Sequence, residues 1–192
     1  MSTTQPIRNK HLLKQFKNYY MEQEFHPRNY TLILVGLNTA LRINDILHLT
    51  WDMVYEKGKV KRHIVVTEQK TGKENRIFLN NEVRGVLQEY KEKAGNDGYH
   101  NPYLFSSMPD SHVPLSRYQA YRIIRKAAQN IGMEDFISCH SLRKTFGYHA
   151  WKQGTPPALL MSIFNHSSYQ ITRRYLCIDQ DDKDEVFSKI RL

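Results

Sequence analysis

Four residues in the last third of the chain have types and spacings that could form a reactive site. His140 and Arg143 are three residues apart, so on a helix they would share one face. His166 follows Arg143 by 23 residues, and Tyr175 follows His166 by nine. Taken singly, these residues could be a surface pair, a helix cap and a packed tyrosine. Their spacing becomes informative when two earlier residues are added.

The two earlier residues are Arg42 and Lys70. Arg42 lies in an apolar segment, where a structural ion pair with Asp45 or Asp52 would be the ordinary explanation. Lys70 lies beside a predicted turn, where a solvated lysine would be expected. We group both with the later four residues because the six in this order resemble a known catalytic pattern, and their types suit phosphodiester cleavage.

Attack on a phosphodiester places extra negative charge on its non-bridging oxygens. Two guanidinium groups can bind these oxygens in a bidentate manner, which a lysine cannot do. We therefore expect Arg42 and Arg143 to clamp the phosphate, with His166 donating a further hydrogen bond. Each such donor contributes on the order of 10²–10³ in rate. Tyr175 supplies the nucleophile, and we expect the cationic pocket to favour its phenolate, although tyrosine ordinarily has a pKa of about 10.

The chain resembles the tyrosine recombinase (phage integrase) family over residues 30–178. The segments that carry the resemblance are Leu41-Arg42-Ile43, Gln69-Lys70-Thr71-Gly72, His140-Ser141-Leu142-Arg143, His166 and Tyr175. The resemblance implies that His140 accepts or relays the tyrosine proton. It also implies that Lys70 is the general acid for the departing 5′-oxygen, and that the intermediate is a 3′-phosphotyrosyl bond.

Two positions depart from the family pattern. Asp45 stands where the family often has glutamate, and one helical turn would still let it steer Arg42. Lys144 replaces a histidine or similar residue after the second arginine, a position that we expect to lie outside the chemistry.

The resemblance implies a site-specific DNA recombinase, similar in size to the short fimbrial phase-variation recombinases. A fragment of a longer integrase is the alternative to a stand-alone enzyme of this length. The rival functions are a type IB topoisomerase-like nicking-closing enzyme and a DNA-binding regulator with little catalysis. We expect neither a metal nor another cofactor, because five cationic or protonatable groups leave little for a metal to do.

The charge balance favours a polyanionic partner. The chain has 192 residues, with 28 Lys and Arg against 19 Asp and Glu, which gives a net charge of +9. Double-stranded DNA is the partner that we expect. The candidate DNA contacts are Lys73, Arg117, Arg122, Arg125 and Lys126, although the last four could simply form a solvated helix face.

Features that are missing from the sequence indicate the cellular location. It has no run of 18 apolar residues that would span a membrane and no apolar signal core near the N-terminus. Cys139 and Cys177 have no metal-binding spacing and are too few for a disulfide framework. We therefore expect a cytoplasmic protein.

The fold class that we expect is mixed α/β, predominantly α-helical with a small antiparallel β-sheet. Residues 1–26 would form an N-terminal tail and helix, and residues 27–192 the catalytic domain. Helices are predicted at 11–20, within 30–49 with a break at Asn38-Thr39, at 81–93, 116–132, 140–153, 157–164 and 168–175. Strands are predicted at 62–67 and 76–79, and a proline-rich loop at 96–115.

A last amphipathic helix is predicted at residues 181–190, with Val186, Phe187 and Ile190 as its apolar stripe. In the family that the chain resembles, the segment after the tyrosine commonly docks on a neighbouring protomer. We therefore expect a tetrameric synapse on DNA, and a monomer or weak oligomer without it. Packing of this helix on its own chain is the alternative.

Overall fold

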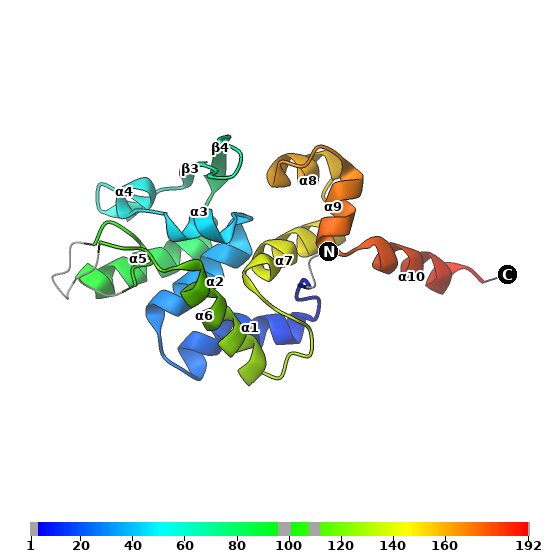
Figure 1. Cartoon of the computed structure of the whole chain (residues 1–192), viewed down its shortest axis with the longest axis horizontal. Coiled ribbons are helices and arrows are strands. Elements are labelled where there is room, and N and C mark those ends of the chain that lie inside the picture. The colour runs from blue at the N-terminus through cyan, green and yellow to red at the C-terminus, as the bar shows by residue number, and fades with distance from the viewer. Residues whose placement is uncertain (1–3, 96–100, 108–111, 192) are drawn as a thin grey trace.

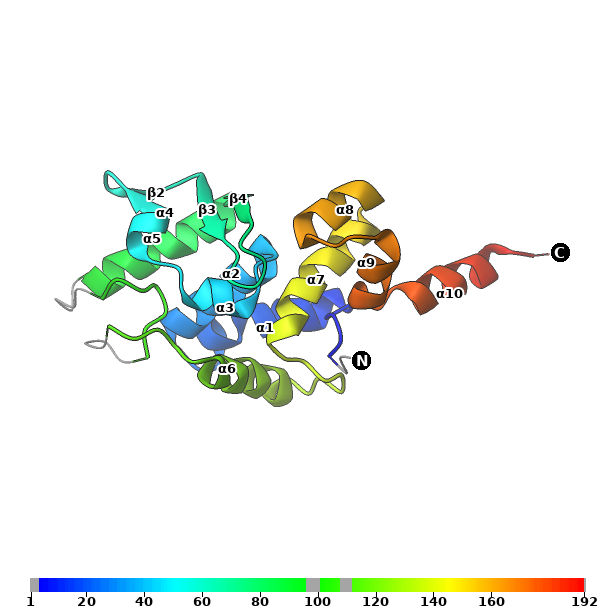
Figure 2. The same ribbon diagram turned by 45° about the horizontal axis from the view of Figure 1, so that its top comes forward.

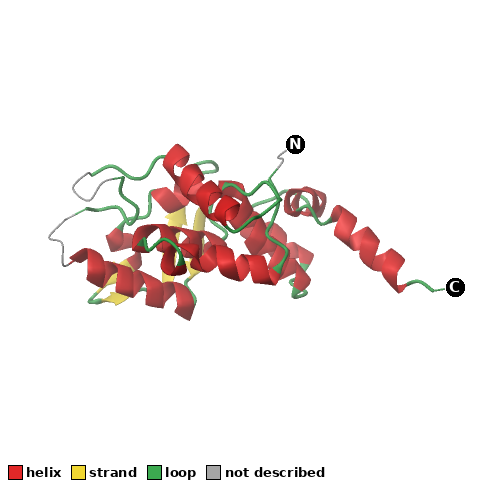
Figure 3. Cartoon of the chain, turned by 90° about the horizontal axis from the view of Figure 1, so that it is seen from below, coloured by secondary structure: helices red, strands yellow, loops and turns green. Residues whose placement is uncertain are grey.

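The computed structural model describes residues 4–95, 101–107 and 112–191, and most of these lie in helices (Figures 1 and 3). The helices are α1 (Lys10–Glu22), α2 (Pro27–Thr39), α3 (Ile43–Leu47), α4 (Trp51–Val54), α5 (Asn81–Gly95), α6 (Arg117–Asn130), α7 (Cys139–Lys152), α8 (Pro157–Phe164), α9 (Tyr169–Leu176) and α10 (Asp179–Lys189). The strands are β1 (Tyr55–Glu56), β2 (Lys59–Val60), β3 (His63–Thr67) and β4 (Glu74–Phe78). The predicted fold class, mainly helical with a small antiparallel sheet, is confirmed.

Helix α2 lies at the centre of the main hydrophobic core. Its residues from Leu32 to Val35 are almost fully buried, and it packs against α1, α5 and α7. A helix that is apolar on every side needs such neighbours around it. From α1, Phe16, Tyr19 and Tyr20 enter the same core, so the N-terminal helix packs as part of this body.

The break after α2 places the first site arginine. Helix α2 ends at Thr39 and is capped by Ala40, which has a left-handed backbone with φ of 54°, and Arg42 then occupies the N-cap position of α3. The predicted break at Asn38-Thr39 is therefore one or two residues too early. Thr39 is still helical, and its hydroxyl donates to the Val35 carbonyl at 2.8 Å.

The predicted hairpin is present. Strands β3 and β4 pair in antiparallel register from His63↔Phe78 to Thr67↔Glu74. The turn that joins them includes Gly72, whose φ of +66° suits glycine. The hairpin and the α8–α9 pair lie on the same side of α2 and α7 (Figures 1 and 2), so the turn can reach the site.

A second, smaller hairpin and helix α4 were not predicted. Strands β1 and β2 have two residues each and are joined by Lys57-Gly58, both with positive φ. Elements this short have too little periodicity to be recognised in a sequence. Residues 96–100 and 108–111 of the predicted proline-rich loop lie outside the described residues.

Helices α7, α8 and α9 form a second core cluster beside the main one, with Tyr175 packed against it. Gly147 on α7 makes this packing possible. A Cβ atom there would lie 2.5 Å from Leu176 and 2.6 Å from Phe164, so only glycine lets the three helices approach this closely. This cluster fixes the C-terminal part of the site.

The two ends of the described chain differ in how they pack against the body. The N-terminal segment runs along α7, where the Ile7 amide donates to the Thr145 hydroxyl at 2.9 Å. Helix α10, predicted at 181–190, projects away from the body (Figures 1 and 2). In the described part of the chain, no helix is long and apolar enough to cross a membrane.

Candidate active site

Arg143 joins the ends of two helices. Its side chain lies on α7 and is only 3% exposed, and its Nη1 donates to the carbonyl of Ala40 at the end of α2. Nη2 donates to the Phe164 carbonyl at 3.0 Å, and the guanidinium carbon lies 4.7 Å from the centre of the Phe164 ring. Because both contacts fix a planar group, Arg143 is held in one orientation before any substrate binds.

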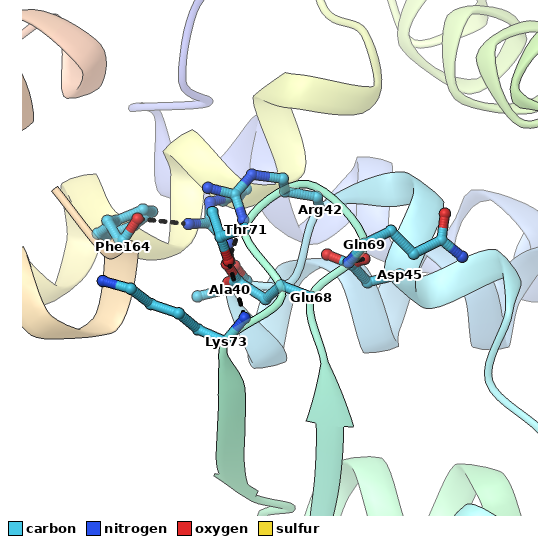
Figure 4. A network of polar contacts seen from close by, with 9 residues as sticks. Ala40, Arg42, Asp45, Glu68, Gln69, Thr71, Lys73 and Phe164 are labelled. Carbon is cyan, nitrogen blue, oxygen red and sulfur yellow. Dashed lines mark hydrogen bonds and ion pairs between the residues drawn. The ribbon is translucent and has the colours of Figure 1, made fainter.

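Arg42 is held by a carboxylate that was not among the predicted site residues. Its Nη1 donates to Oε2 of Glu68 at 2.6 Å, and the Glu68 side chain is fully buried. The Thr71 hydroxyl donates to the same oxygen at 2.8 Å (Figure 4). A buried charge requires such partners, so this cluster is a fixed part of the site.

The prediction that Asp45 steers Arg42 is wrong. Asp45 Oδ1 accepts a hydrogen bond from the Gln69 amide at 3.0 Å, and among the described residues Asp45 forms no ion pair with Arg42. The prediction assumed that both residues share a helical turn. Arg42 instead precedes the helix with an extended backbone, at φ −72° and ψ 148°.

Lys70 is exposed at the hairpin turn, between the anchored residues Gln69 and Thr71. The charge of Lys70 on this turn reaches His140 at the start of α7. Burial lowers the pKa of His140, and the positive charges of Lys144, Arg117, Arg143 and Lys70 lower it further. His140 is therefore a neutral group that can accept a proton at neutral pH.

His166 and Tyr175 lie against each other. Their ring centres are 5.3 Å apart at an interplanar angle of 76°, and Phe164 packs on both rings. Nδ1 of His166 lies 3.1 Å from the Thr172 hydroxyl, which fixes the imidazole and leaves Nε2 for a substrate. Burial lowers the pKa of His166, as do Arg143 and Arg42.

The pKa of Tyr175 is raised above its ordinary value, contrary to the expectation that the pocket favours phenolate. Burial is the largest cause and raises the pKa, whereas Arg143 and Arg42 lower it by a smaller amount. The free site therefore holds a protonated phenol. A proton acceptor is needed at the moment of attack.

Lys144 lies closer to the nucleophile than we expected from the sequence. It is 2% exposed, and its Nζ lies 5.4 Å from the centre of the Tyr175 ring. Nζ donates to the Thr4 carbonyl at 2.7 Å and lies 3.4 Å from Cys177 Sγ. Helical position alone could not reveal these partners, because both are far away in sequence.

The candidate DNA contacts divide into two groups. Lys73, Arg117 and Arg122 are exposed, and the charge of Arg117 reaches His140. Arg125 is half-buried and donates to the Ile137 carbonyl at 3.3 Å, and Lys126 forms an ion pair with Glu24 at 2.7 Å. Arg122, Arg125 and Lys126 also line a groove of 630 Å³ between α6 and the α1–α2 junction.

No metal centre is formed by the residues that the structure describes, since they contain no group of three or more His, Cys, Asp or Glu side chains suited to a metal ion. Cys139 and Cys177 are both free thiols. Burial raises the pKa of Cys139 to about 11, which makes it an unreactive structural residue at neutral pH.

Comparison with known proteins identifies the family of the chain. The pattern described as "Phage integrase family" matches residues 8–181. The chain is 41% identical over 181 residues to the probable integrase/recombinase YoeC of Bacillus subtilis, covering 94% of this chain and 93% of YoeC. It is 28% identical over 151 residues to the type 1 fimbriae regulatory protein FimE of Escherichia coli K12, covering 77% of this chain and 73% of FimE.

Solved structures show the same fold. The XerA recombinase superposes with a TM-score of 0.77 at 20% identity, covering 98% of this chain and 67% of XerA. The XerH site-specific recombinase bound to a palindromic difH substrate gives a TM-score of 0.75 at 20% identity, over 98% of this chain and 52% of XerH. These likenesses show the fold, and the match over residues 8–181 with the 41% identity to YoeC shows that the chain belongs to the phage integrase family of tyrosine recombinases.

Proposed function

We propose that this chain, as a tyrosine-type site-specific DNA recombinase, cleaves and rejoins DNA strands through a covalent bond to Tyr175. The observation that carries the proposal is that the predicted catalytic side chains meet at one tyrosine, Tyr175. The charges of Arg42 and Arg143 act on the Tyr175 hydroxyl, and the His166 ring lies against the Tyr175 ring. These side chains come from the α2–α3 break, α7, the α8–α9 turn and α9, so the fold brings them together from distant parts of the sequence.

The two arginines bind the phosphate that is attacked. Arg143 is fixed by two carbonyls and Arg42 by Glu68, so both guanidinium groups are oriented before DNA arrives. Preorganised donors of this kind stabilise the charge that develops on non-bridging oxygens. In the tautomer in which Nδ1 accepts from the Thr172 hydroxyl, Nε2 of His166 carries the proton and donates a further hydrogen bond to the phosphate.

The reaction forms one phosphoester bond as it breaks another, so it needs no external energy source. The Tyr175 oxygen forms a bond to phosphorus as its proton leaves towards His140, whose lowered pKa keeps it neutral. The bond from phosphorus to the 5′-oxygen breaks, and Lys70 donates a proton to that oxygen. A free 5′-hydroxyl can reverse the attack, because a phosphotyrosyl bond replaces one phosphodiester with another.

Double-stranded DNA and other protomers are the partners that we propose. Solved relatives include XerH bound to difH substrate and a lambda integrase dimer bound to a core site. The net charge of +9 supports DNA binding. We infer that the affinity for DNA falls steeply as the salt concentration rises. We place the activity in the cytoplasm, where a chromosomal or mobile DNA substrate would be found in bacteria such as those that encode YoeC and FimE.

The test is covalent trapping on a nicked suicide oligonucleotide, from which the cleaved end diffuses away. Wild-type protein should form an adduct that migrates as a protein–DNA conjugate, and Tyr175→Phe should form none. No adduct from wild type would contradict the enzyme function. Relaxation of supercoiled plasmids without recombinants on paired sites would instead support a topoisomerase-like activity.

A further inference from the structure

Glu68 is a buried carboxylate at the junction of two catalytic segments. It follows β3, whose buried residues Ile64 and Val66 alternate with exposed ones, and it continues on their buried face. An unpaired carboxylate at such a position would be strongly destabilising. The contacts that compensate for this burial therefore indicate the role of Glu68.

These contacts reach both segments through one oxygen. Oε2 of Glu68 accepts from Arg42 Nη1 at 2.6 Å and from the Thr71 hydroxyl at 2.8 Å (Figure 4). The Glu68 carbonyl also accepts from the amide of Gly72 at 2.8 Å, and its own amide donates to the Lys73 carbonyl at 2.9 Å. Glu68 thus anchors the whole turn that carries Lys70.

The carboxylate stays ionised in this environment. Burial raises the pKa of Glu68, but the hydrogen bonds from Thr71 and Arg42 and the charge of Arg42 outweigh it, so that the pKa is lowered overall. The Asn165 amide, next to His166, also lowers this pKa, although Oε1 accepts no well-formed hydrogen bond within the described chain. An ionised carboxylate is the form that holds a guanidinium most strongly.

We propose that Glu68 is a positioning residue that couples the phosphate-binding Arg42 to the turn bearing the general acid Lys70. This inference rests on the proposed DNA cleavage. Glu68 uses one terminal nitrogen of Arg42, and within the described residues Nε and Nη2 of Arg42 donate to no other side chain, so both remain for a phosphate. Any shift of Glu68 would move the clamp and the acid together.

Asp45 performs a related task at the other side of the turn. It holds the amide of Gln69, directly before Lys70, whereas Glu68 holds the hydroxyl of Thr71, directly after it. The Lys70 backbone is therefore fixed on both flanks, while its side chain is free to reach a substrate. Only Glu68 among these two carboxylates also binds Arg42.

The experiment measures single-turnover cleavage by Glu68→Gln, which removes the charge but keeps the shape. Three suicide substrates are used: ordinary DNA, DNA with sulfur as the 5′-bridging atom, and DNA with a methylphosphonate at the scissile position. Sulfur leaves without a proton, so it bypasses Lys70. The methylphosphonate lacks one charged oxygen, so it depends less on Arg42. Glu74→Gln, an exposed glutamate on the same hairpin, is the matched control.

On ordinary DNA we expect Glu68→Gln to be slower than wild type by roughly 10- to 100-fold, the cost of an ångström-scale misplacement. This deficit in the cleavage rate of Glu68→Gln relative to wild type should shrink on both modified substrates. The cleavage rate of Glu74→Gln should match that of wild type on all three substrates. A deficit that is equal on the three substrates would mean that Glu68 only maintains the fold. A deficit that shrinks on one modified substrate alone, or no deficit, would overturn the coupling.

Thr71→Val keeps the test decisive if Glu68→Gln does not fold, because it removes only the contact to the turn. Its deficit on ordinary DNA should disappear on the sulfur substrate and persist on the methylphosphonate. Absence of any deficit in Thr71→Val would then contradict the inference. Failure of wild type to form an adduct would instead refute the proposed function, so the two failures are distinguishable.

Discussion

The ammonium group of Lys144 lies 5.4 Å from the centre of the Tyr175 ring, on a side chain that is almost fully buried. The same group donates to the carbonyl of Thr4 and lies within 3.4 Å of Cys177 Sγ. Arg8 strengthens the connection, because its Nη2 donates to the Cys177 carbonyl at 3.0 Å. The N-terminal segment is thus fastened to the residues directly after the nucleophile.

Lys144→Met should slow DNA cleavage by about tenfold, in keeping with a buried cation–aromatic contact of about 1–2 kcal/mol. Methionine retains most of the packing volume but removes the ammonium group that contacts the Tyr175 ring. Adduct formation on the suicide substrate measures the effect. Lys152→Met is the control, since Lys152 contacts Trp151 on the same helix but lies outside the site. Equal rates for both variants would show that Lys144 is only structural.

Cleavage should lose rate at acidic pH with a midpoint below about 6.5, the ordinary histidine value. The pKa of His140 is lowered, mainly by burial, so the ring is neutral and able to accept a proton until the pH falls through that lowered pKa. Single-turnover rates between pH 5 and 8 would show this limb, and His140→Gln should flatten it. If the limb persists in the variant, another group such as His166 is responsible.

Gly147→Ala should impair both stability and cleavage. The new methyl group would meet Leu176 at 2.5 Å and Phe164 at 2.6 Å, and overpacking of this kind costs about 1–3 kcal/mol. Phe164 also accepts a hydrogen bond from Arg143, so its displacement disturbs the clamp. Thermal unfolding and cleavage well below the unfolding temperature measure the two effects.

Gly85→Ala is the control for this substitution. Gly85 lies within α5, and a methyl group added there would meet no neighbouring element within 4 Å. Alanine at this position should therefore raise stability by about 0.5–1 kcal/mol and leave cleavage unchanged. A Gly147→Ala protein that cleaves at the wild-type rate would show that the contact between α7 and α9 does not position Tyr175.

Much of the fold could be predicted because its helices carry strong local signals. The capping box at Ser116 and Gln119 and the Gly-Pro-Pro stop at residues 154, 156 and 157 mark helix ends through neighbouring residues alone. The hairpin was predicted from β-branched residues and a glycine turn. In contrast, the end of α2 was misplaced because Ala40 adopts a left-handed conformation that local propensity disfavours.

The supports of the site were harder to predict than its reactive groups. Glu68 could have been suspected, because it continues the buried alternation of Ile64 and Val66, where a charge must find a partner. Its partner Arg42 is 26 residues away, however, and no local spacing favours it over Asp45. The raised pKa of Tyr175 depends on burial by several helices, which no sequence pattern quantifies.

Arg117→Ala should weaken DNA binding and reduce the slope of log affinity against log salt by about 1, as expected when one phosphate contact is lost. Arg117 is exposed and its charge reaches His140 at the site. Lys126→Ala should change the slope less, because Lys126 is already paired with Glu24. Fluorescence anisotropy over a salt series measures both, and equal slopes for the two variants would contradict this ranking.

Phe187→Ser should prevent assembly on DNA without destabilising the monomer. Phe187 is 78% exposed, beside Val186 at 55% and Ile190 at 59%, on a helix that projects from the body (Figure 1). Removal of so exposed a side chain should change the free energy of unfolding by less than about 0.5 kcal/mol. An exposed apolar cluster on a projecting helix is expected to be covered in an assembly, and the neighbouring protomer is the partner that we propose.

Phe25→Ser is the matched control, since Phe25 is 66% exposed but lies between α1 and α2. Thermal unfolding of the free protein and analytical ultracentrifugation with paired DNA sites would separate the two properties. We expect Phe187→Ser to bind single sites and to lose the higher-order complex, while Phe25→Ser retains it. A Phe187→Ser protein that unfolds at lower temperature would show instead that α10 packs on its own chain. Unchanged assembly would show that this helix does not join the protomers.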